Sequence, residues 1–196
     1  MLRSFRGISP TLAPHCFIAD TAIVIGNVTI GEHSSVWFNT VIRGDVDKIT
    51  IGHHTNIQDL TMVHVTGGLA CTNIGNYVTI GHSAVIHGCT IEDRCLIGMG
   101  AKVLDYAIIG TESIVAAGAV VPPGMIVPPR SMVVGVPGKI KKTLSDGEVK
   151  ELDRFWQAYI ELKETYLSET ESSESLASVE SGESFGLGTR SSMNLP

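Results

Sequence analysis

The stretch that decides the fold is residues 91–127, IEDRCLIGMGAKVLDYAIIGTESIVAAGAVVPPGMIV, in which an aliphatic β-branched residue returns at every sixth position. The same period begins at Ile18, runs to Ile86 and, after this stretch, ends at Val133. The position four residues after each aliphatic residue is usually small or short, as at Ala22, Ser34, Thr40, Thr55, Thr61, Ala84, Cys95, Ala101, Ala107, Ser113 and Ala119. A period of six is neither helical nor simply alternating, and it indicates a solenoid whose short strands bury their apolar residues by stacking coil on coil. We therefore predict an all-β solenoid of hexapeptide repeats.

Interruptions of the period show where loops leave the coils. Three hexapeptides close one triangular coil, so equivalent residues about eighteen positions apart should stack about 4.8 Å apart. The steps after Ile42 and Val63 carry three and five extra residues, and the step after Ile86 is one residue short. Insertions in a solenoid leave the coil on one face and often carry function. We expect such loops at residues 47–50 and 67–73.

Composition limits the class of protein. With 196 residues and 43% hydrophobic content, the chain can bury one sizeable core. A net charge of −6, a pI near 5.6 and the lack of a Lys/Arg cluster give no electrostatic basis for binding nucleic acid or an anionic membrane. Residues 1–7 lack the apolar core of a secretion signal, and no stretch approaches eighteen apolar residues, so we expect a cytoplasmic protein. The four cysteines form no C-x-x-C pair, which favours reduced packing thiols over a disulfide or a cysteine metal site.

A helix is predicted after the last coil. Residues 136–138, Val-Pro-Gly, break the strand pattern, and Ser145 with Glu148 forms a capping box. Apolar residues then recur at three- and four-residue spacing through residues 149–167, opposite a charged face. The helix should therefore pack along the prism.

The end of the chain has a different composition. Residues 169–196 are acidic, rich in serine and poor in large apolar residues, so burial cannot offset the entropy of ordering them. We predict a solenoid domain over residues 1–138, a helical segment over residues 139–168 and a disordered tail over residues 169–196.

Three of the seven histidines are related by the coil count. If the second loop protrudes, Arg43, His64 and His87 follow equivalent aliphatic residues on successive coils and form one ladder. By the same count Asp59 and His82 form a second ladder on the adjacent face. A corner separates the two ladders, so the three imidazoles should not converge within one chain. Threefold packing of prisms could bring one subunit's His64 and His87 against a neighbour's His82.

Three such imidazoles suit metal chemistry. Three neutral imidazoles around zinc leave a fourth position for a water, whose pKa zinc lowers to about 7. Iron and cobalt accept the same ligands. A histidine on a solenoid face can equally be a solvated polar residue with no ligand, and we assign His15, His33, His53 and His54, for which we find no aligned partner, to the surface.

Several segments together carry a family resemblance: residues 35–45 (SVWFNTVIRGD), 55–59 (TNIQD), 63–64 (VH), 80–88 (IGHSAVIHG), 97–101 (IGMGA) and 133–138 (VVGVPG). Over about residues 4–167 the chain resembles the γ-class carbonic anhydrases and their bacterial relatives of the phenylacetate-degradation and carnitine-metabolism type. The resemblance implies a left-handed parallel β-helix, which physics alone would not predict because parallel crossovers are right-handed in roughly 98% of cases. It also implies a homotrimer with metal sites at its interfaces and reversible hydration of CO2 to bicarbonate by metal-bound hydroxide.

The resemblance also implies the metal ligands. His64 and His87 would bind the metal from one subunit and His82 from the next. The expected metal is Zn2+, with Fe2+ or Co2+ as alternatives. Tyr159 and Asn39 are two further candidates to reach the site.

Four other residues match positions that surround the metal in this family. Arg43, Asp45 and Asp59 match interfacial ion-pair residues, and Gln58 matches the side chain that positions metal-bound water or bicarbonate. A buried arginine at a subunit contact would pair with carboxylates and fix the register of the trimer. Structural and catalytic roles are therefore compatible at these positions.

The chain departs from the family at the proton relay. The best-characterised member has a Glu directly after the residue that matches Asp45, and a second Glu on an acidic loop. Here Val46 occupies the first position, and residues 66–73 contain no carboxylate. Proton release would then use buffer, water chains or rim side chains such as His53 or Asp47, and we expect slow or absent turnover.

Two other functions fit the same residues. The metal-bound hydroxide of a hexapeptide protein could attack an acyl-CoA thioester, as a thioesterase or acyltransferase, although the sequence has no extended loop suited to coenzyme A. The chain could also be a non-catalytic subunit of a larger assembly. Loss of metal binding would favour the last of these.

Overall fold

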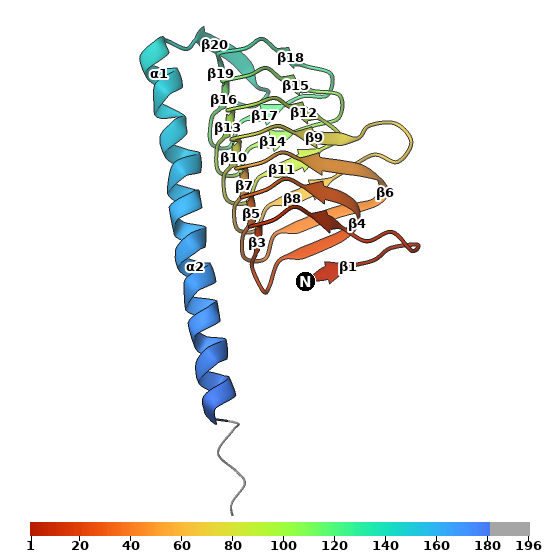
Figure 1. The fold of residues 1–196 in the computed structure, drawn as a ribbon. Helices are drawn as coiled ribbons and strands as arrows, with labels where there is room; N and C mark the ends of the chain where they lie inside the picture. The colour runs from red at the N-terminus through yellow and green to blue at the C-terminus, as the bar shows by residue number, and fades with distance from the viewer. Residues whose placement is uncertain (181–196) are drawn as a thin grey trace, which may run out of the picture. The chain divides into compact units, whose positions relative to one another are not determined.

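The computed structural model describes the backbone of residues 1–180 and the side chains of residues 1–169. Residues 1–163 form one compact unit, and residues 164–180 continue its last helix. The unit is a left-handed parallel β-helix of about seven turns followed by a helical segment, as predicted (Figure 1). Within residues 1–180, no helix is long and apolar enough to cross a membrane.

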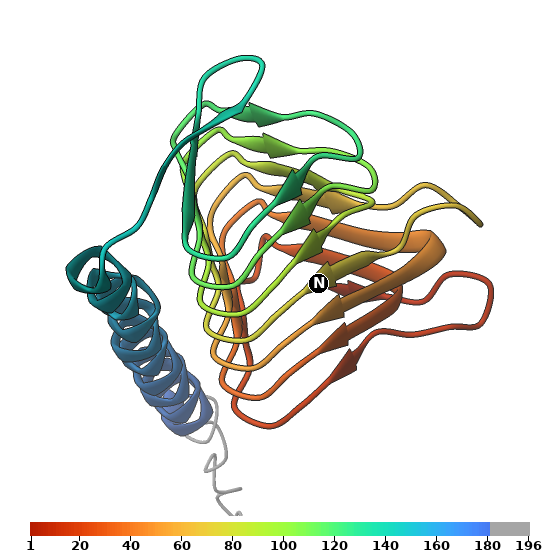
Figure 2. The same ribbon diagram turned by 90° about the horizontal axis from the view of Figure 1, so that it is seen from above.

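The strands are short and lie one above another in triangular coils (Figure 2). One sheet has twelve strands, with the path β17-β14-β11-β8-β6-β9-β12-β15-β18 and β4, β1 and β2 beside it, and the second has the order β20-β19-β16-β13-β10-β7-β5-β3. Their bounds are β1 Leu2–Arg3, β2 Thr11–Leu12, β3 Phe17–Ile18, β4 Ile23–Ile30, β5 Ser35–Val36, β6 Val41–Ile51, β7 Asn56–Ile57, β8 Met62–His64, β9 Thr72–Ile74, β10 Thr79–Ile80, β11 Val85–His87, β12 Thr90–Ile91, β13 Leu96–Ile97, β14 Lys102–Val103, β15 Ile108–Ile109, β16 Ile114–Val115, β17 Val120–Val121, β18 Ile126–Val127, β19 Ser131–Val134 and β20 Lys139–Thr143.

The six-residue period forms the core. From Val24 to Val133, every aliphatic residue of the period is at most 3% exposed, and all the small residues that follow them are buried. Burial raises the pKa of the Cys95 thiol, one of these small positions, to about 12. Strand pairing also follows the count, because Val63 pairs with Ile42 below and Ile86 above. The predicted coil register is therefore confirmed.

The first predicted loop, residues 47–50, is wrong in its position. These residues belong to β6, which pairs with β4 with a register shift: Gly26 lies opposite Gly44, and Val28 lies opposite Ile49. Residues 45–48 thus bulge from the ladder, and Ile49 is already back in the core with no exposed surface. The prediction of three extra residues after Ile42 was right, but the regular pairing resumes at Ile49 and not at Ile51.

The second insertion leaves the coil as predicted. Thr66 and Ala70 form an isolated antiparallel bridge across its base, and Leu69 at its tip is 69% exposed. Its predicted last residues, 72 and 73, belong instead to β9, which pairs with β6. The loop proper is therefore residues 66–71, next to the strand end that carries His64.

One corner of the prism carries a stack of rings that the sequence count missed. The rings of His15 and His33 are 4.9 Å apart and nearly parallel, and those of His33 and His54 are 5.0 Å apart. Tyr77 continues the stack 5.2 Å from His54. The prediction that these histidines lack aligned partners was wrong, because they are equivalent corner residues on successive coils, each with a positive φ.

The helices α1 (Asp146–Glu151) and α2 (Asp153–Glu180) begin along this corner. The ring of Trp156 lies 4.9 Å from Tyr77 and 6.0 Å from His54. Asp153 on the same helix pairs with Arg94 at 3.1 Å. Stacked rings and ion pairs therefore fix the helical segment on the corner.

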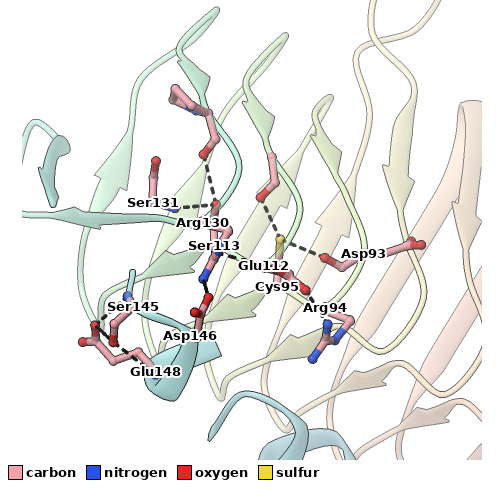
Figure 3. A network of polar contacts seen from close by, with 12 residues as sticks. Asp93, Arg94, Cys95, Glu112, Ser113, Arg130, Ser131, Ser145, Asp146 and Glu148 are labelled. Atoms are coloured by element: carbon pink, nitrogen blue, oxygen red, sulfur yellow. Dashed lines mark hydrogen bonds and ion pairs between the residues drawn. The ribbon is translucent and has the colours of Figure 1, made fainter. Parts of the chain in front are cut away.

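Charged residues continue the corner beyond Tyr77 and meet the start of α1 (Figure 3). Arg94 pairs with Glu112 on the next coil, and Arg130 above it pairs with Asp146. The capping box predicted at Ser145 is confirmed. Hydrogen bonds from Lys142 and Ser145 lower the pKa of Glu148 in this box to about 2.

Two boundaries at the C-terminal end differ from the prediction. Residues 139–143, which we included in the helical segment, form β20 and pair antiparallel with β19. The backbone of α2 reaches Glu180, past the predicted start of the tail at residue 169. The rest of that predicted tail, residues 181–196, lies outside the described residues.

Acidification should destabilise this corner. Burial and the neighbouring charges of His33, His53 and Lys163 lower the pKa of His54 below 6.5 in the fold, although Glu32 opposes them. Below about pH 6.5 the unfolded chain then binds more protons at His54 than the folded chain, so this part of the stability is present above that pH and is lost as pH falls. Thermal unfolding between pH 7.5 and 5 should show a falling Tm. His54→Asn, which tolerates the positive φ, should flatten the slope, and an unchanged slope would contradict the assignment.

Candidate metal centre

His64 and His87 end two adjacent strands and meet ring to ring. β8 and β11 pair in parallel with His64 opposite His87, and the His64 Nδ1 and His87 Nε2 atoms are 3.2 Å apart. Behind each ring lies a carboxylate: Asp45 Oδ1 is 3.0 Å from His64 Nε2, and Asp105 Oδ1 is 2.5 Å from His87 Nδ1. Arg43 pairs with the second oxygen of Asp45. The structure therefore brings together four of the predicted residues with Asp105, which the sequence analysis did not find.

The second group surrounds His82. Its Nδ1 atom lies 2.7 Å from Asp59 Oδ2, and its Nε2 atom lies 3.5 Å from the Tyr159 hydroxyl on α2. Gln58 is 6% exposed and donates from Nε2 to Asn56 Oδ1 at 3.1 Å. Burial, with a smaller effect from the charge of Asp59, raises the pKa of Tyr159 above 10.0, so the hydroxyl keeps its proton near neutral pH.

A cavity of about 320 Å³ adjoins the second group. Gln58, Thr79 and His82 are its polar lining residues, and mainly apolar residues with Phe155 of α2 form the rest of its walls. The exposed Asn39, the other candidate named from the sequence, is not among its lining residues. The arrangement can hold a small apolar molecule beside an amide and an imidazole.

The carboxylates of the first group are held ionised. Burial acts to raise the pKa of Asp45, but hydrogen bonds from Arg43 and His64 outweigh it and keep the pKa below 3.8. Burial likewise acts to raise the pKa of Asp105, and hydrogen bonds from His87 and Thr66 keep it below 3.8. Near neutral pH both carboxylates are therefore acceptors only.

The charge of the two carboxylates determines which nitrogen of His64 and of His87 carries a proton and which presents a lone pair. If each carboxylate accepts from the far nitrogen of its imidazole, each far nitrogen carries the proton and each near nitrogen presents a lone pair. Two lone pairs 3.2 Å apart repel unless a shared proton or a metal ion lies between them. Two nitrogens bound tetrahedrally to zinc at 2.0–2.1 Å are themselves about 3.3 Å apart. The His64–His87 pair therefore fits two of the ligands of a zinc-like ion.

His82 belongs to the other group. Among the side chains of residues 1–169 of one chain, no three His, Cys, Asp or Glu are placed to hold a metal ion together. Asp59, which we expected among interfacial ion-pair residues, contacts His82 and accepts a 3.2 Å hydrogen bond from the Phe38 amide. A complete three-histidine site would thus need His82 from a second chain.

The candidate relay residues lie in two different places. Asp47 accepts hydrogen bonds from the Lys48 and Gly68 amides and the Cys71 thiol, which lower its pKa below 3.8. His53 lies at the ring-stacked corner, with its Nδ1 atom 2.9 Å from that of His54. Neither side chain contacts His64, His82 or His87 in a hydrogen bond or ion pair given by the described structure.

Comparison with known proteins supports a family assignment. The bacterial transferase hexapeptide (six repeats) family matches residues 71–105 and 88–123. The "Probable carbonic anhydrase" of Methanocaldococcus jannaschii is 51% identical over 148 residues, which cover 76% of this chain and 92% of that protein. The mitochondrial "Gamma carbonic anhydrase 2" of Arabidopsis thaliana is 42% identical over 170 residues; the match covers 84% of this chain but only 61% of the plant protein.

Among solved structures, a hexapeptide transferase family protein from Anaplasma phagocytophilum superimposes with a TM-score of 0.81 at 40% identity. The match covers 85% of this chain and 98% of that one. Fold, sequence and paired histidines thus agree, and the chain belongs to the γ-class carbonic anhydrase family of hexapeptide-repeat proteins.

Proposed function

We propose that the protein is a carbonic anhydrase that hydrates CO2 reversibly at a metal centre shared between the subunits of a homotrimer. His64 and His87 would come from one subunit and His82 from its neighbour. The pair of imidazole nitrogens 3.2 Å apart, each with a carboxylate behind its ring, is the observation that carries the proposal. Family membership supplies the reaction, since the relatives are named as carbonic anhydrases.

The metal would supply hydroxide, because a zinc ion in an open three-histidine site lowers the pKa of a bound water to about 7. We assign Zn2+ as the metal, while three imidazoles also accept Fe2+ or Co2+. Asp45 and Asp105 would hold the protons on the far nitrogens of their imidazoles. Asp59 would do the same for His82, 2.7 Å away.

Gln58 is proposed to orient CO2 and bicarbonate. Its amide nitrogen donates to Asn56, whose own amide donates to Thr79 at 2.9 Å, so the side chain is fixed in direction. It shares a cavity with His82, and the apolar walls of that cavity suit uncharged CO2 better than the bicarbonate product. Product release would then be favoured over retention.

Exposed apolar residues support a subunit contact near the histidines. Leu60 is 62% exposed and Met62 is 36% exposed, and both lie between Asp59 and His64 in sequence. Contiguous apolar surface marks interaction sites, so these two residues are candidates to contact a neighbouring subunit. Arg43, whose side chain is 39% exposed, would also be covered by a neighbouring subunit in the proposed trimer.

Stopped-flow CO2 hydration by protein loaded with Zn2+, Co2+ or Fe2+ tests the function and its proton transfer together. Because Val46 replaces a relay carboxylate and Asp47 has a lowered pKa, we expect the rate to rise with buffer concentration and to be slow in dilute buffer. A rate already at its maximum in dilute buffer would show an internal relay. No metal-dependent rate at any buffer concentration would overturn the function.

Acyl-thioester hydrolysis is the second candidate, since the apolar cavity beside His82 could also take part of an acyl chain. The same metal-loaded samples should be tested with short acyl-CoA esters. Hydrolysis that is faster than CO2 hydration and is lost on metal removal would favour this candidate. A cytoplasmic location stays a prediction from the sequence.

A further inference from the structure

Asp105 is absent from the residues to which the family resemblance gives a role, yet it makes the shortest contact to either ring of the His64–His87 pair. We propose that Asp105 is a positioning residue that fixes the tautomer and direction of the His87 ring. Its Oδ1 atom lies 2.5 Å from His87 Nδ1, at the end of the ring remote from His64. The effect of this contact on metal binding rests on the proposed function, whereas the contact itself lies within one chain.

The contact decides which nitrogen of His87 can bind a metal. A carboxylate accepts a hydrogen bond, so His87 carries its proton on Nδ1 and presents an unprotonated Nε2. That Nε2 atom is the one 3.2 Å from the His64 ring. Without Asp105, His87 could place its proton on Nε2 and donate it to His64, which would use up both lone pairs.

The local structure is built to hold the Asp105 carboxylate at this point. Asp105 follows β14 and aligns with Gly88, one residue beyond His87. A Cβ atom on Gly88 would lie 2.3 Å from Asp105 Oδ1, so glycine leaves the space that the carboxylate needs. Thr66 donates a hydrogen bond to the other oxygen at 2.9 Å. Gly88 leaves room for one oxygen of the carboxylate and Thr66 hydrogen-bonds to the other, so the orientation of Asp105 toward His87 is fixed.

The same pairing recurs at the other two proposed ligands. Asp45 holds His64 and Asp59 holds His82. A carboxylate that accepts a hydrogen bond from the nitrogen that does not bind the metal fixes the tautomer of a metal-binding histidine. Removal of such a carboxylate typically weakens metal binding about 10- to 100-fold. Asp105 would complete the set, with one carboxylate for each imidazole.

The test uses Asp105→Ala and Asp105→Asn in the full chain, with Asp20→Asn as a control at an exposed aspartate to which the described structure gives no contact with His64, His82 or His87. Zinc affinity is measured by competition with a chelator, and the His87 tautomer is measured by nitrogen-15 NMR of the metal-free protein at mildly alkaline pH. We expect Asp105→Ala to weaken zinc binding about 10- to 100-fold and to move the proton of His87 from Nδ1 to Nε2. Asp105→Asn keeps a carbonyl acceptor, so it should retain the tautomer and lose less affinity.

An unchanged affinity and an unchanged tautomer in folded Asp105→Ala would overturn the proposal. If that variant fails to fold, Asp105→Asn and Thr66→Val decide it, since zinc affinity unchanged in both would contradict the role. If the wild-type protein binds none of Zn2+, Co2+ and Fe2+, the proposed function fails, while the tautomer measurement still decides whether Asp105 positions His87. The two failures are therefore distinguishable.

Discussion

Replacing His82 with alanine should abolish metal retention and reduce CO2 hydration to the uncatalysed rate, while the prism stays folded. The side chain is 41% exposed, so its removal leaves no core cavity and should change Tm little. If every site of the trimer takes its third ligand from a neighbour's His82, one substitution per chain destroys all three sites. Metal content after gel filtration, hydration rate and Tm give the three readouts.

His15→Asn is the matched control. It removes an exposed imidazole from the corner stack at a positive φ that asparagine accepts. Metal content and rate should stay at wild-type values in this variant. If His82→Ala retained stoichiometric zinc, His82 would not be a ligand.

Gly52→Ala should destabilise the solenoid strongly, because the added methyl would meet the backbone of the next coil. Gly31, Gly52 and Gly75 stack on consecutive coils, and a Cβ on Gly52 would lie 2.6 Å from both the carbonyl carbon and the carbonyl oxygen of Gly75. The obstacle is backbone, so two coils must separate. We expect a loss of about 3 kcal/mol, at the upper end for overpacking, which lowers Tm by about 6–12 °C in a chain of this size.

Gly118→Ala separates this clash from simple backbone strain. Gly118 has a φ of +67° and no atom within 4 Å of its missing Cβ, so the cost should be the left-handed strain alone, about 1 kcal/mol. Thermal unfolding of both variants measures the difference. Equal shifts in Tm would show that the coils separate easily and that the glycine stack is not needed for close packing.

The sequence predicted the core well because one physical pattern carries it. Each aliphatic residue of the period is both the buried residue and the centre of a strand, so counting by six placed Val63 above Ile42 and His87 above His64. Handedness could not be predicted in this way, since the preference of parallel crossovers points to the opposite hand. It came only from the family resemblance.

What the count missed lies at corners and insertions. His33 and His54 are 21 positions apart because the bulge of β6 lies between them, and a fixed step of eighteen hides the match. β20 was missed because its sequence, KIKKT, has no hexapeptide pattern and all five residues are exposed.

Asp105 was missed for a related reason. It aligns with Gly88 and not with His87, so no ladder of like residues pointed to it. The signal available in the sequence was a small residue, Gly88, directly after His87, with an acidic residue, Asp105, aligned with it on the next coil. Reading the residues on either side of each ladder position, and not only the equivalents, would have found it.

Subunit complementation tests the interfacial centre most directly. His82→Ala and His64→Ala/His87→Ala chains should be co-expressed with different affinity tags, and trimers that carry both tags isolated and loaded with zinc. Every mixed trimer of threefold symmetry would hold one complete site, so CO2 hydration should recover to about one third of the wild-type rate, while each parent stays inactive. Mixed trimers no more active than their parents, beside an active wild-type protein, would contradict a centre shared between subunits.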